Sequence, residues 1–277
     1  MSCDGNSLDP VSSSDLGAVS ALVTAIRWPH RRADVQSLIE LGHGRIARDP
    51  GDGSLLGVGL WWPFGERAAR IGLVIVDPAR QGRGLGRRMM ETLVADAARP
   101  IMLLATRAGR PLYDRLGFVE TGAVCQHQGE YHGRTVVDPR IRSAAPYDLA
   151  VIQRIDAEAT GLDRTRVLRH LMGLGRTAVL TEGGAVVGYA LERAFGRGSV
   201  IGPIVAPTED GAIALFDALA APGFVRVDRS AGATALGRHL ESCGLALDSE
   251  SAAMVLGDWP GDHNPPRLHA LASHALG

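Results

Sequence analysis

The chain has 277 residues, with 29 lysines and arginines against 30 aspartates and glutamates, which gives a formal net charge of −1. A charge this close to neutral provides no positive field for a nucleic-acid backbone, so we expect no nucleic-acid partner. The sequence has no apolar run long enough to cross a bilayer, and its first residues lack the basic and apolar segments of a secretion signal. We therefore expect a cytoplasmic protein without a membrane partner. The three cysteines, Cys3, Cys125 and Cys243, are scattered and odd in number, which argues against a disulfide framework.

The N-terminal part is predicted to form two helices followed by an antiparallel run of strands. One helix begins near Asp15 and is interrupted by Trp28-Pro29-His30, and a second begins near Asp34. Short apolar stretches separated by Asp, Pro and Gly residues then indicate strands. They are expected at residues 44–48, 54–62 and 68–76. Helices and strands in this order indicate a mixed α/β layer.

A loop with a glycine at every second position follows the third strand. It reads Gln81-Gly82-Arg83-Gly84-Leu85-Gly86-Arg87 and leads into an amphipathic helix. Backbone N–H groups of a tight glycine turn at a helix N-terminus form an anion site, to which the arginines add positive charge. The spacing fits neither the P-loop nor the dinucleotide fingerprint. A glycine turn that binds nothing is the alternative, but the loop favours a phosphate-bearing ligand.

A second motif follows in the next strand and helix. Residues 101–106 are predicted to form a buried strand, and the helical segment after them contains Tyr113 and ends at Gly117, before Phe118. A purely structural tyrosine at a helix end is the alternative to a functional one.

Together the two motifs resemble the GNAT superfamily of N-acetyltransferases. The segment from Gln81 to Gly86 matches the family's Q/R-x-x-G-x-G/A loop, which holds the pyrophosphate of acetyl-CoA, and Tyr113 with Gly117 and Phe118 matches its Tyr-x-x-x-Gly-Phe arrangement. The resemblance implies an α/β fold with an α+β mixed sheet and acetyl-CoA as the cofactor. It also implies acetyl transfer to the amine of a small molecule or amino acid by direct attack, with Tyr113 as the general acid.

The resemblance also implies which residues hold the cofactor. The end of the strand before the loop would supply a backbone N–H to the oxyanion. Thr106 stands where many members have an asparagine that positions the cofactor. The implied cofactor-binding residues are Val74, Ile75, Val76, Gln81, Gly82, Arg83, Gly84, Leu85, Gly86, Arg87, Thr106 and Tyr113.

The second half of the chain resembles a degenerate copy of the first. Residues 178–191 repeat the strand, turn and strand, and residues 200–207 echo residues 71–78. A repeat of this length indicates domain duplication, so we expect two tandem GNAT-like acyl-CoA N-acyltransferase domains. The expected limits are residues 1–138 for a catalytic domain, 139–258 for a degenerate GNAT-like domain and 259–277 for a tail ending in a short helix over 268–276.

The copy lacks the residues that carry the chemistry. Glu209 and Asp210 align with the arginine and glutamine that open the loop, and Leu240 aligns with Tyr113. Carboxylates repel a pyrophosphate, and leucine cannot donate a proton. We therefore expect the second domain to serve as a scaffold, a substrate wall or the surface of a homodimer.

The general base is left open by the sequence. The strand 68–76 has Arg70 as its only ionisable residue, whereas several family members carry a glutamate there. Glu66, His30 and His127 are candidate bases, and a chain of water molecules is the alternative.

The acceptor site is predicted from aromatic and histidine residues. Aromatic side chains can hold an apolar or cationic amine, although positions in the core are the alternative. The candidate substrate-binding residues are Trp28, His30, Trp61, Trp62 and His127. Cys125, His127 and His132 lack an evident fourth ligand for zinc, so no metal is expected.

An acetyl-CoA-dependent N-acetyltransferase acting on a small-molecule amine is the leading interpretation. Because the strand 68–76 lacks a carboxylate base, a second interpretation is a protein that binds or senses acyl-CoA without catalysis. A protein that uses its degenerate half for assembly is the third interpretation.

Overall fold

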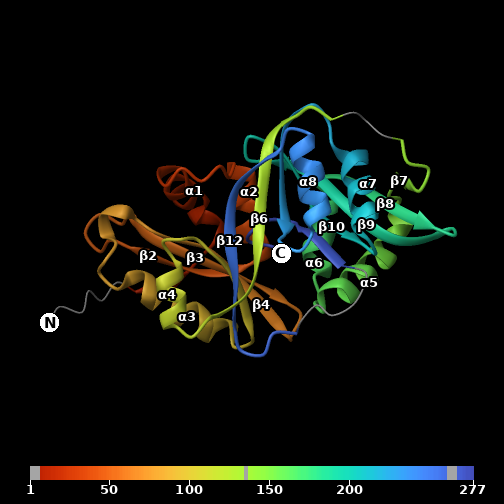
Figure 1. The fold of residues 1–277 in the computed structure, drawn as a ribbon. Coiled ribbons are helices and arrows are strands. Elements are labelled where there is room, and N and C mark those ends of the chain that lie inside the picture. The colour runs from red at the N-terminus through yellow and green to blue at the C-terminus, as the bar shows by residue number, and fades with distance from the viewer. Residues whose placement is uncertain (1–6, 134–136, 261–266) are drawn as a thin grey trace.

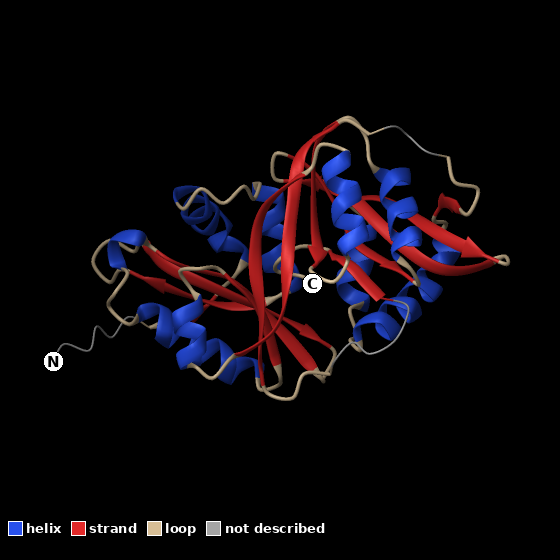
Figure 2. Ribbon diagram, in the orientation of Figure 1, coloured by secondary structure: helices blue, strands red, loops and turns tan. Residues whose placement is uncertain are grey.

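A computed structural model describes residues 7–133, 137–260 and 267–277. Its strands form one 13-stranded mixed sheet in the order β1-β2-β3-β4-β5-β12-β6-β11-β13-β10-β9-β8-β7. Figure 1 shows two lobes joined by the long strands β6 and β12, and Figure 2 shows helices flanking the strands of each lobe. The sheet thus confirms the expected mixed α/β class. In the part of the chain that the structure describes, no helix is both long and apolar enough to cross a membrane.

The first half contains the predicted helices and strands in the predicted order. The interruption at Trp28 and Pro29 separates the first two helices as expected, because proline lacks the N–H that a helix interior needs. The elements are β1 (Leu8–Pro10), α1 (Leu16–Ala25), α2 (Arg32–Leu41), β2 (His43–Arg48), β3 (Leu55–Phe64), β4 (Ala68–Val76), α3 (Leu85–Ala97), β5 (Ile101–Ala105), α4 (Arg110–Arg115) and β6 (Val119–Tyr131).

The second half repeats this order, as the duplication predicts. Its elements are β7 (Ile141–Ser143), α5 (Leu149–Thr160), α6 (Thr165–Met172), β8 (Gly175–Glu182), β9 (Ala185–Phe195), β10 (Gly198–Ala206), α7 (Glu209–Leu219), β11 (Gly223–Ser230), α8 (Thr234–Ser242), β12 (Ala246–Leu256) and β13 (Arg267–Leu271).

The C-terminal tail forms the strand β13 over residues 267–271 and a turn over residues 274–276, so the prediction of a helix over residues 268–276 is wrong. The strand β13 pairs antiparallel with both β10 and β11. These two strands pair directly only at Ser199–Val225 and Val200–Arg226 and then separate. The open edges offer unpaired backbone groups, and buried groups of that kind need hydrogen-bond partners. This tertiary demand outweighs the helical tendency of a segment rich in alanine and leucine.

The two halves exchange their final strands. The strand β12 of the second half lies between β5 and β6 of the first, and β6 lies between β12 and β11. In Figure 1 both strands run through the middle of the molecule. Each half therefore completes its sheet with a strand from the other. A division at residue 138 separates the halves along the chain but not in space.

The strands β4 and β5 separate in the same manner as β10 and β11. They pair in parallel only at Ala69–Ile101 and Arg70–Met102. Beyond these pairs, Leu73 has a positive φ of 50° and the register with β3 shifts. Among the described residues no strand fills the resulting gap, whereas β13 lies in the corresponding gap of the other half.

The strand exchange predicts that neither half folds alone. A fragment of residues 1–138 would leave β5 and β6 without their neighbour β12. The complementary fragment, residues 139–277, would leave β11 without its neighbour β6. We expect no cooperative thermal unfolding of either fragment by circular dichroism, and recovery of the transition when the two are refolded together. The full chain is the control. A fragment of residues 1–138 that melts at the temperature of the full chain would contradict the exchange.

Candidate active site

The glycine loop is an exposed turn between β4 and α3. Gly82 and Gly84 both have left-handed backbone angles, with φ of 77° and 83°, and Gly84 caps the N-terminus of α3. A Cβ placed on either glycine would meet nothing within 4 Å. The space beside the turn is therefore open to a ligand. The N–H groups of the first turn of α3 lack helical acceptors and suit an anion at this position.

The structure also fixes the shape of the loop. Asp77 accepts a hydrogen bond from the Ala79 backbone N–H at 2.9 Å, and the Gln81 side-chain amide donates to the Val76 carbonyl at 3.2 Å. Leu85 is buried against Ala47 and Leu56 and anchors the start of α3. The loop is thus held in place before any ligand arrives.

Two arginines of the loop are paired with carboxylates. Arg80 contacts Asp49 at 2.8 Å, and Arg87 contacts Glu91 at 2.8 Å. Both pairs are partly exposed, so they are screened by solvent and contribute little to stability. Arg83 is exposed within the turn itself. The side of the loop that faces solvent therefore remains rich in cations.

Val74, Ile75 and Val76 lie at the loop end of β4, along the gap between β4 and β5. Ile75 is buried, whereas its two neighbours are half-buried. Thr106 follows β5, and its hydroxyl accepts a hydrogen bond from the Gly109 N–H at 3.1 Å. The threonine therefore shapes the turn into α4. The structure places these residues around one end of the gap.

Tyr113 lies on α4 with its side chain packed into the core of the first half. It is 8% exposed, and its ring contacts Phe118 with centroids 5.9 Å apart. Gly109 lies against the phenol, since a Cβ there would be 3.2 Å from the hydroxyl oxygen. Burial raises the pKa of Tyr113 to about 12. The hydroxyl is therefore protonated at neutral pH, as a general acid requires.

Glu66 lies apart from the glycine loop. It is in the turn between β3 and β4, at the opposite end of β4, and its side chain is 98% exposed with Arg99 at 4.0 Å. A nine-residue strand spans roughly 25–30 Å, so the length of β4 separates Glu66 from the loop. Its surroundings are those of a solvated surface carboxylate.

His127 is fully buried on β6, and both of its ring nitrogens have partners. Its Nε2 accepts a hydrogen bond from the Arg229 Nε at 3.0 Å, because a guanidinium can only donate. Its Nδ1 therefore carries the proton and donates to the Leu245 carbonyl at 3.1 Å. Burial lowers the pKa of His127. The ring braces β6 against β11 and the start of β12, and it has no free nitrogen for a substrate.

His30 lies in a different part of the molecule. Its ring packs between Trp28 and Phe195, with centroid distances of 5.9 Å and 5.3 Å. Burial lowers the pKa of His30 to about 4, which makes it a weak base. It lines a hollow of about 200 Å³ between α2 and the second half.

The tryptophans do not form one acceptor site. Trp62 is fully buried, and its indole N–H donates to the Leu38 carbonyl at 3.0 Å, as a core residue does. Trp61 stacks on His43 at 4.8 Å and lines a surface hollow with Glu66. Trp28 packs against the core formed by α1 and α2. The predicted substrate residues thus lie in at least three separate environments.

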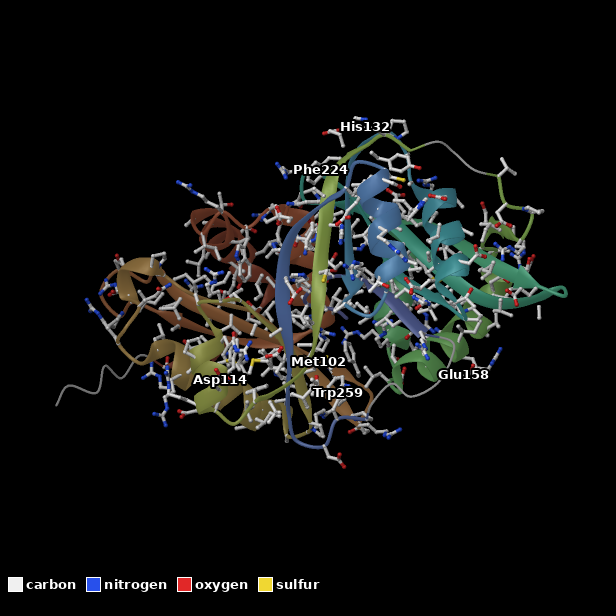
Figure 3. All side chains as sticks on the ribbon, in the orientation of Figure 1. Met102, Asp114, His132, Glu158, Phe224 and Trp259 are labelled. Atoms are coloured by element: carbon white, nitrogen blue, oxygen red, sulfur yellow. The ribbon has the colours of Figure 1, made fainter. Side chains whose placement is uncertain are left out.

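A cavity of about 270 Å³ lies where β4 and β5 separate. We call it the interdomain cavity, since it is lined by residues of β4, β5, β6 and β12 on one side and of α5, the α5–α6 connection and β13 on the other. Figure 3 labels Met102 and Trp259, two of its lining residues, which lie near one another beside β12. Sequence reasoning noted Arg70 on this strand but missed the cavity, because its walls come from both halves.

In the second half, neither the position that corresponds to the glycine loop nor the one that corresponds to the gap between β4 and β5 is open. After β10, Thr208 caps α7 directly, so that Glu209 and Asp210 lie in the first turn of a helix and no glycine loop forms. Glu209 accepts a hydrogen bond from the Leu236 N–H at 2.9 Å. In the gap, β13 approaches so closely that a Cβ on Gly202 would lie 2.0 Å from the Leu271 carbonyl oxygen. These features support the expectation that the second half does not hold the cofactor.

Cys125 and His127, considered above as zinc ligands and set aside, each have other partners. Cys125 lies 3.6 Å from Glu250, and His127 has the two partners given above. Among the described residues, one group with metal-ligand chemistry converges, formed by Asp217, His239 and Cys243. The His239 Nε2 lies 2.7 Å from Asp217 and 3.7 Å from the Cys243 sulfur. We interpret the group as a hydrogen-bonded contact that holds α7 against α8.

Comparison with known proteins agrees with this architecture. Family models described as acetyltransferase (GNAT) domains match residues 43–120 and, separately, residues 152–266. The Bacillus subtilis protein YitH, named an uncharacterized N-acetyltransferase, is 32% identical over 221 residues, which cover 76% of this chain and 77% of YitH.

Solved structures share the fold at low sequence identity. A Pyrococcus horikoshii protein assigned as an acetyltransferase has a TM-score of 0.81 at 22% identity, covering 100% of this chain and 98% of its own. A tandem GNAT protein from the clavulanic acid biosynthesis pathway has a TM-score of 0.64 at 14% identity, covering 93% and 100%. With two GNAT domains in sequence and in structure, the chain belongs to the GNAT superfamily of N-acetyltransferases, in its tandem form.

Proposed function

We propose that the first domain transfers an acetyl group from acetyl-CoA to the amine of a small molecule or an amino acid. A difference between the two domains supports this proposal. The first domain has an open glycine loop, an unfilled gap between β4 and β5 and a protonated Tyr113, whereas the second domain has all three positions closed or replaced.

Acetyl-CoA would bind with its pyrophosphate on the loop and its pantetheine arm along the gap. The preformed turn and the open space beside Gly82 and Gly84 fit such a group. When bound, acetyl-CoA supplies a thioester as the acetyl donor. Holding that thioester in one orientation lowers the entropic part of the barrier. The loop and the edge of β4 would provide this orientation.

Groups of the first domain would then stabilise the oxyanion and protonate the leaving thiolate. The neutral amine attacks the thioester carbonyl, and a backbone N–H of β4 near Val76 stabilises the oxyanion. As the carbon–sulfur bond breaks, the Tyr113 hydroxyl donates its proton to the leaving thiolate. The amide forms as the nitrogen loses its extra proton.

We propose that water removes the proton from the amine. Glu66 and His127 have the exposed and fully paired positions described above, and His30 lies in a separate hollow. None of the three lines the interdomain cavity. A chain of water molecules from this cavity to solvent needs no protein base.

Replacing Gly84 should weaken cofactor binding. In Gly84→Val, the new side chain occupies the space that the loop leaves for an anion, and a left-handed valine strains the turn. Loss of even one charged hydrogen bond, roughly 1.5–3 kcal/mol, predicts at least a ~10-fold lower affinity for acetyl-CoA. Isothermal titration calorimetry measures this, with one site per chain expected in the wild type.

Gly53→Val is the matched control for Gly84→Val. Gly53 has a similar φ of 72° in an exposed turn, with equally open surroundings. Both variants should lose similar stability, but only the loop variant should lose affinity. Equal affinities in the two variants would refute the loop assignment.

Replacing Tyr113 should slow the reaction without weakening cofactor binding. We expect Tyr113→Phe to lower kcat about 100-fold, the usual contribution of a general acid. Because the pKa of Tyr113 is about 12, its ionisation should cause no loss of wild-type rate in the mildly alkaline range. Thiol release from acetyl-CoA with an amine panel measures both effects.

Tyr131→Phe serves as the control for Tyr113→Phe. Tyr131 is also buried, but it packs on Phe216 in the second half. An unchanged kcat in Tyr113→Phe would show that Tyr113 is not the general acid. Cofactor binding without turnover on any amine would instead favour an acyl-CoA sensor.

A further inference from the structure

Arg70 is a buried cation without a carboxylate partner among the described residues. It lies in β4, is 4% exposed and lines the interdomain cavity. Its Nη2 donates one long hydrogen bond, of 3.4 Å, to the His274 carbonyl, and its Nε has no partner within the described ranges. By contrast, neighbouring Arg164 is paired with Asp156.

Such an arrangement is costly unless something compensates the charge. Burying an ion costs several kcal/mol, and this is recovered only through good partners. Burial, with the nearby Arg164, lowers the pKa of Arg70 to about 9, so the guanidinium is still charged at neutral pH. Asp156 compensates Arg164, whereas none of the ion pairs among the described residues includes Arg70; Gly277, which also lines the cavity, lies against both guanidinium groups.

Arg70 lies beside the proposed path of the thioester. Its pair with Met102 is the last one before β4 and β5 separate. On β5, Ile101, Leu103 and Ala105 pack into the core with α3, while Met102 and Leu104 face the cavity. The cavity therefore lies on the sheet face opposite α3 and reaches the gap in which we place the acetyl donor.

The cavity suits a small ligand with one anionic group. Its volume of about 270 Å³ lies just below the usual range for drug-sized ligands, which begins near 300 Å³. Most of its wall is apolar, and the hydroxyls of Thr121, Thr160 and Ser230 in that wall each donate to a backbone carbonyl, so they do not compete with Arg70 for an anion. A planar guanidinium matches a carboxylate in geometry, and a single charge matches a monoanion better than a doubly charged phosphate.

We propose that the interdomain cavity binds an acceptor that carries a carboxylate as well as the reacting amine, with Arg70 as the carboxylate-binding residue. This inference rests on the proposed acetyltransferase function and narrows its substrate class. The carboxylate supplies the partner that Arg70 lacks, and the apolar wall holds the rest of the molecule. The amine then points along β4 toward the gap.

The test compares amino acids with their carboxamides, which keep the amine and lose the negative charge. In wild type, we expect kcat/KM for thiol release to be about 10- to 100-fold higher for the free acids, the effect of one charged hydrogen-bonded pair. Arg70→Met should remove this preference by raising KM for the acids alone. Arg70→Lys should retain part of it, since lysine keeps the charge without the planar fork.

Arg169→Met is the matched control, because Arg169 is an exposed arginine lining a different hollow. It should keep the wild-type preference. The thermal midpoint of Arg70→Met should stay equal or rise, since an apolar side chain replaces a buried charge that has no ion-pair partner among the described residues. A marked fall in that midpoint would identify Arg70 as a structural residue and overturn the proposal.

Further measurements separate this proposal from the proposed function. Acetyl-CoA affinity, measured by calorimetry, should be the same in wild type and Arg70→Met. Direct binding of amino acids, measured by calorimetry, tests the site even if no amine is acetylated. Equal kcat/KM for acids and amides in wild type, or amino-acid binding that is unchanged in Arg70→Met, would refute the role of Arg70.

Discussion

The organisation of this protein depends on how two pairs of separating parallel strands satisfy their backbone groups. In each half, the two strands pair at only two positions before they diverge. A buried backbone N–H or C=O needs a partner, so each gap must be filled by chain, ligand or water. In the second half β13 fills the gap with its own hydrogen bonds. In the first half no strand of the described residues fills the gap, and the proposed division of function between the two similar domains rests on this difference.

The exchange of β6 and β12 has a second consequence. Because each lobe takes a strand from the other, the lobes are fixed relative to one another by main-chain hydrogen bonds. A cavity between them can then have walls from both halves. The degenerate domain supplies the α5–α6 region and β13 to that cavity. A domain that lost its loop can in this way keep a role in the site of its partner.

The charges of the site fit this division. The loop presents exposed arginines to solvent, where the pyrophosphate of the proposed donor would meet them. The cavity presents one buried arginine, whose single charge would select among small acceptors rather than attract them from afar. The two regions lie on either side of the same gap, so the proposed donor and acceptor would meet between β4 and β5.

The sequence by itself determined the local parts of this protein. Alternating apolar runs and turn residues placed the strands and helices, and the glycines of the loop predicted a tight turn. Gly82 and Gly84 adopt left-handed angles in that turn, which glycine does without a steric penalty. The duplication and the loss of the loop at Glu209 and Asp210 were also predicted from the sequence, since both depend only on the order of residues along the chain. Local geometry and local motifs are encoded by neighbouring residues.

Only the tertiary structure decided what depends on distant partners. His127 and Trp62 have the chemistry of site residues, but Arg229, Leu245 and Leu38 occupy their polar atoms. The tail became a strand because two remote strands had free edges. The interdomain cavity and the unpaired charge of Arg70 arise from elements far apart in the sequence, and no local pattern records which side chains will surround a buried group.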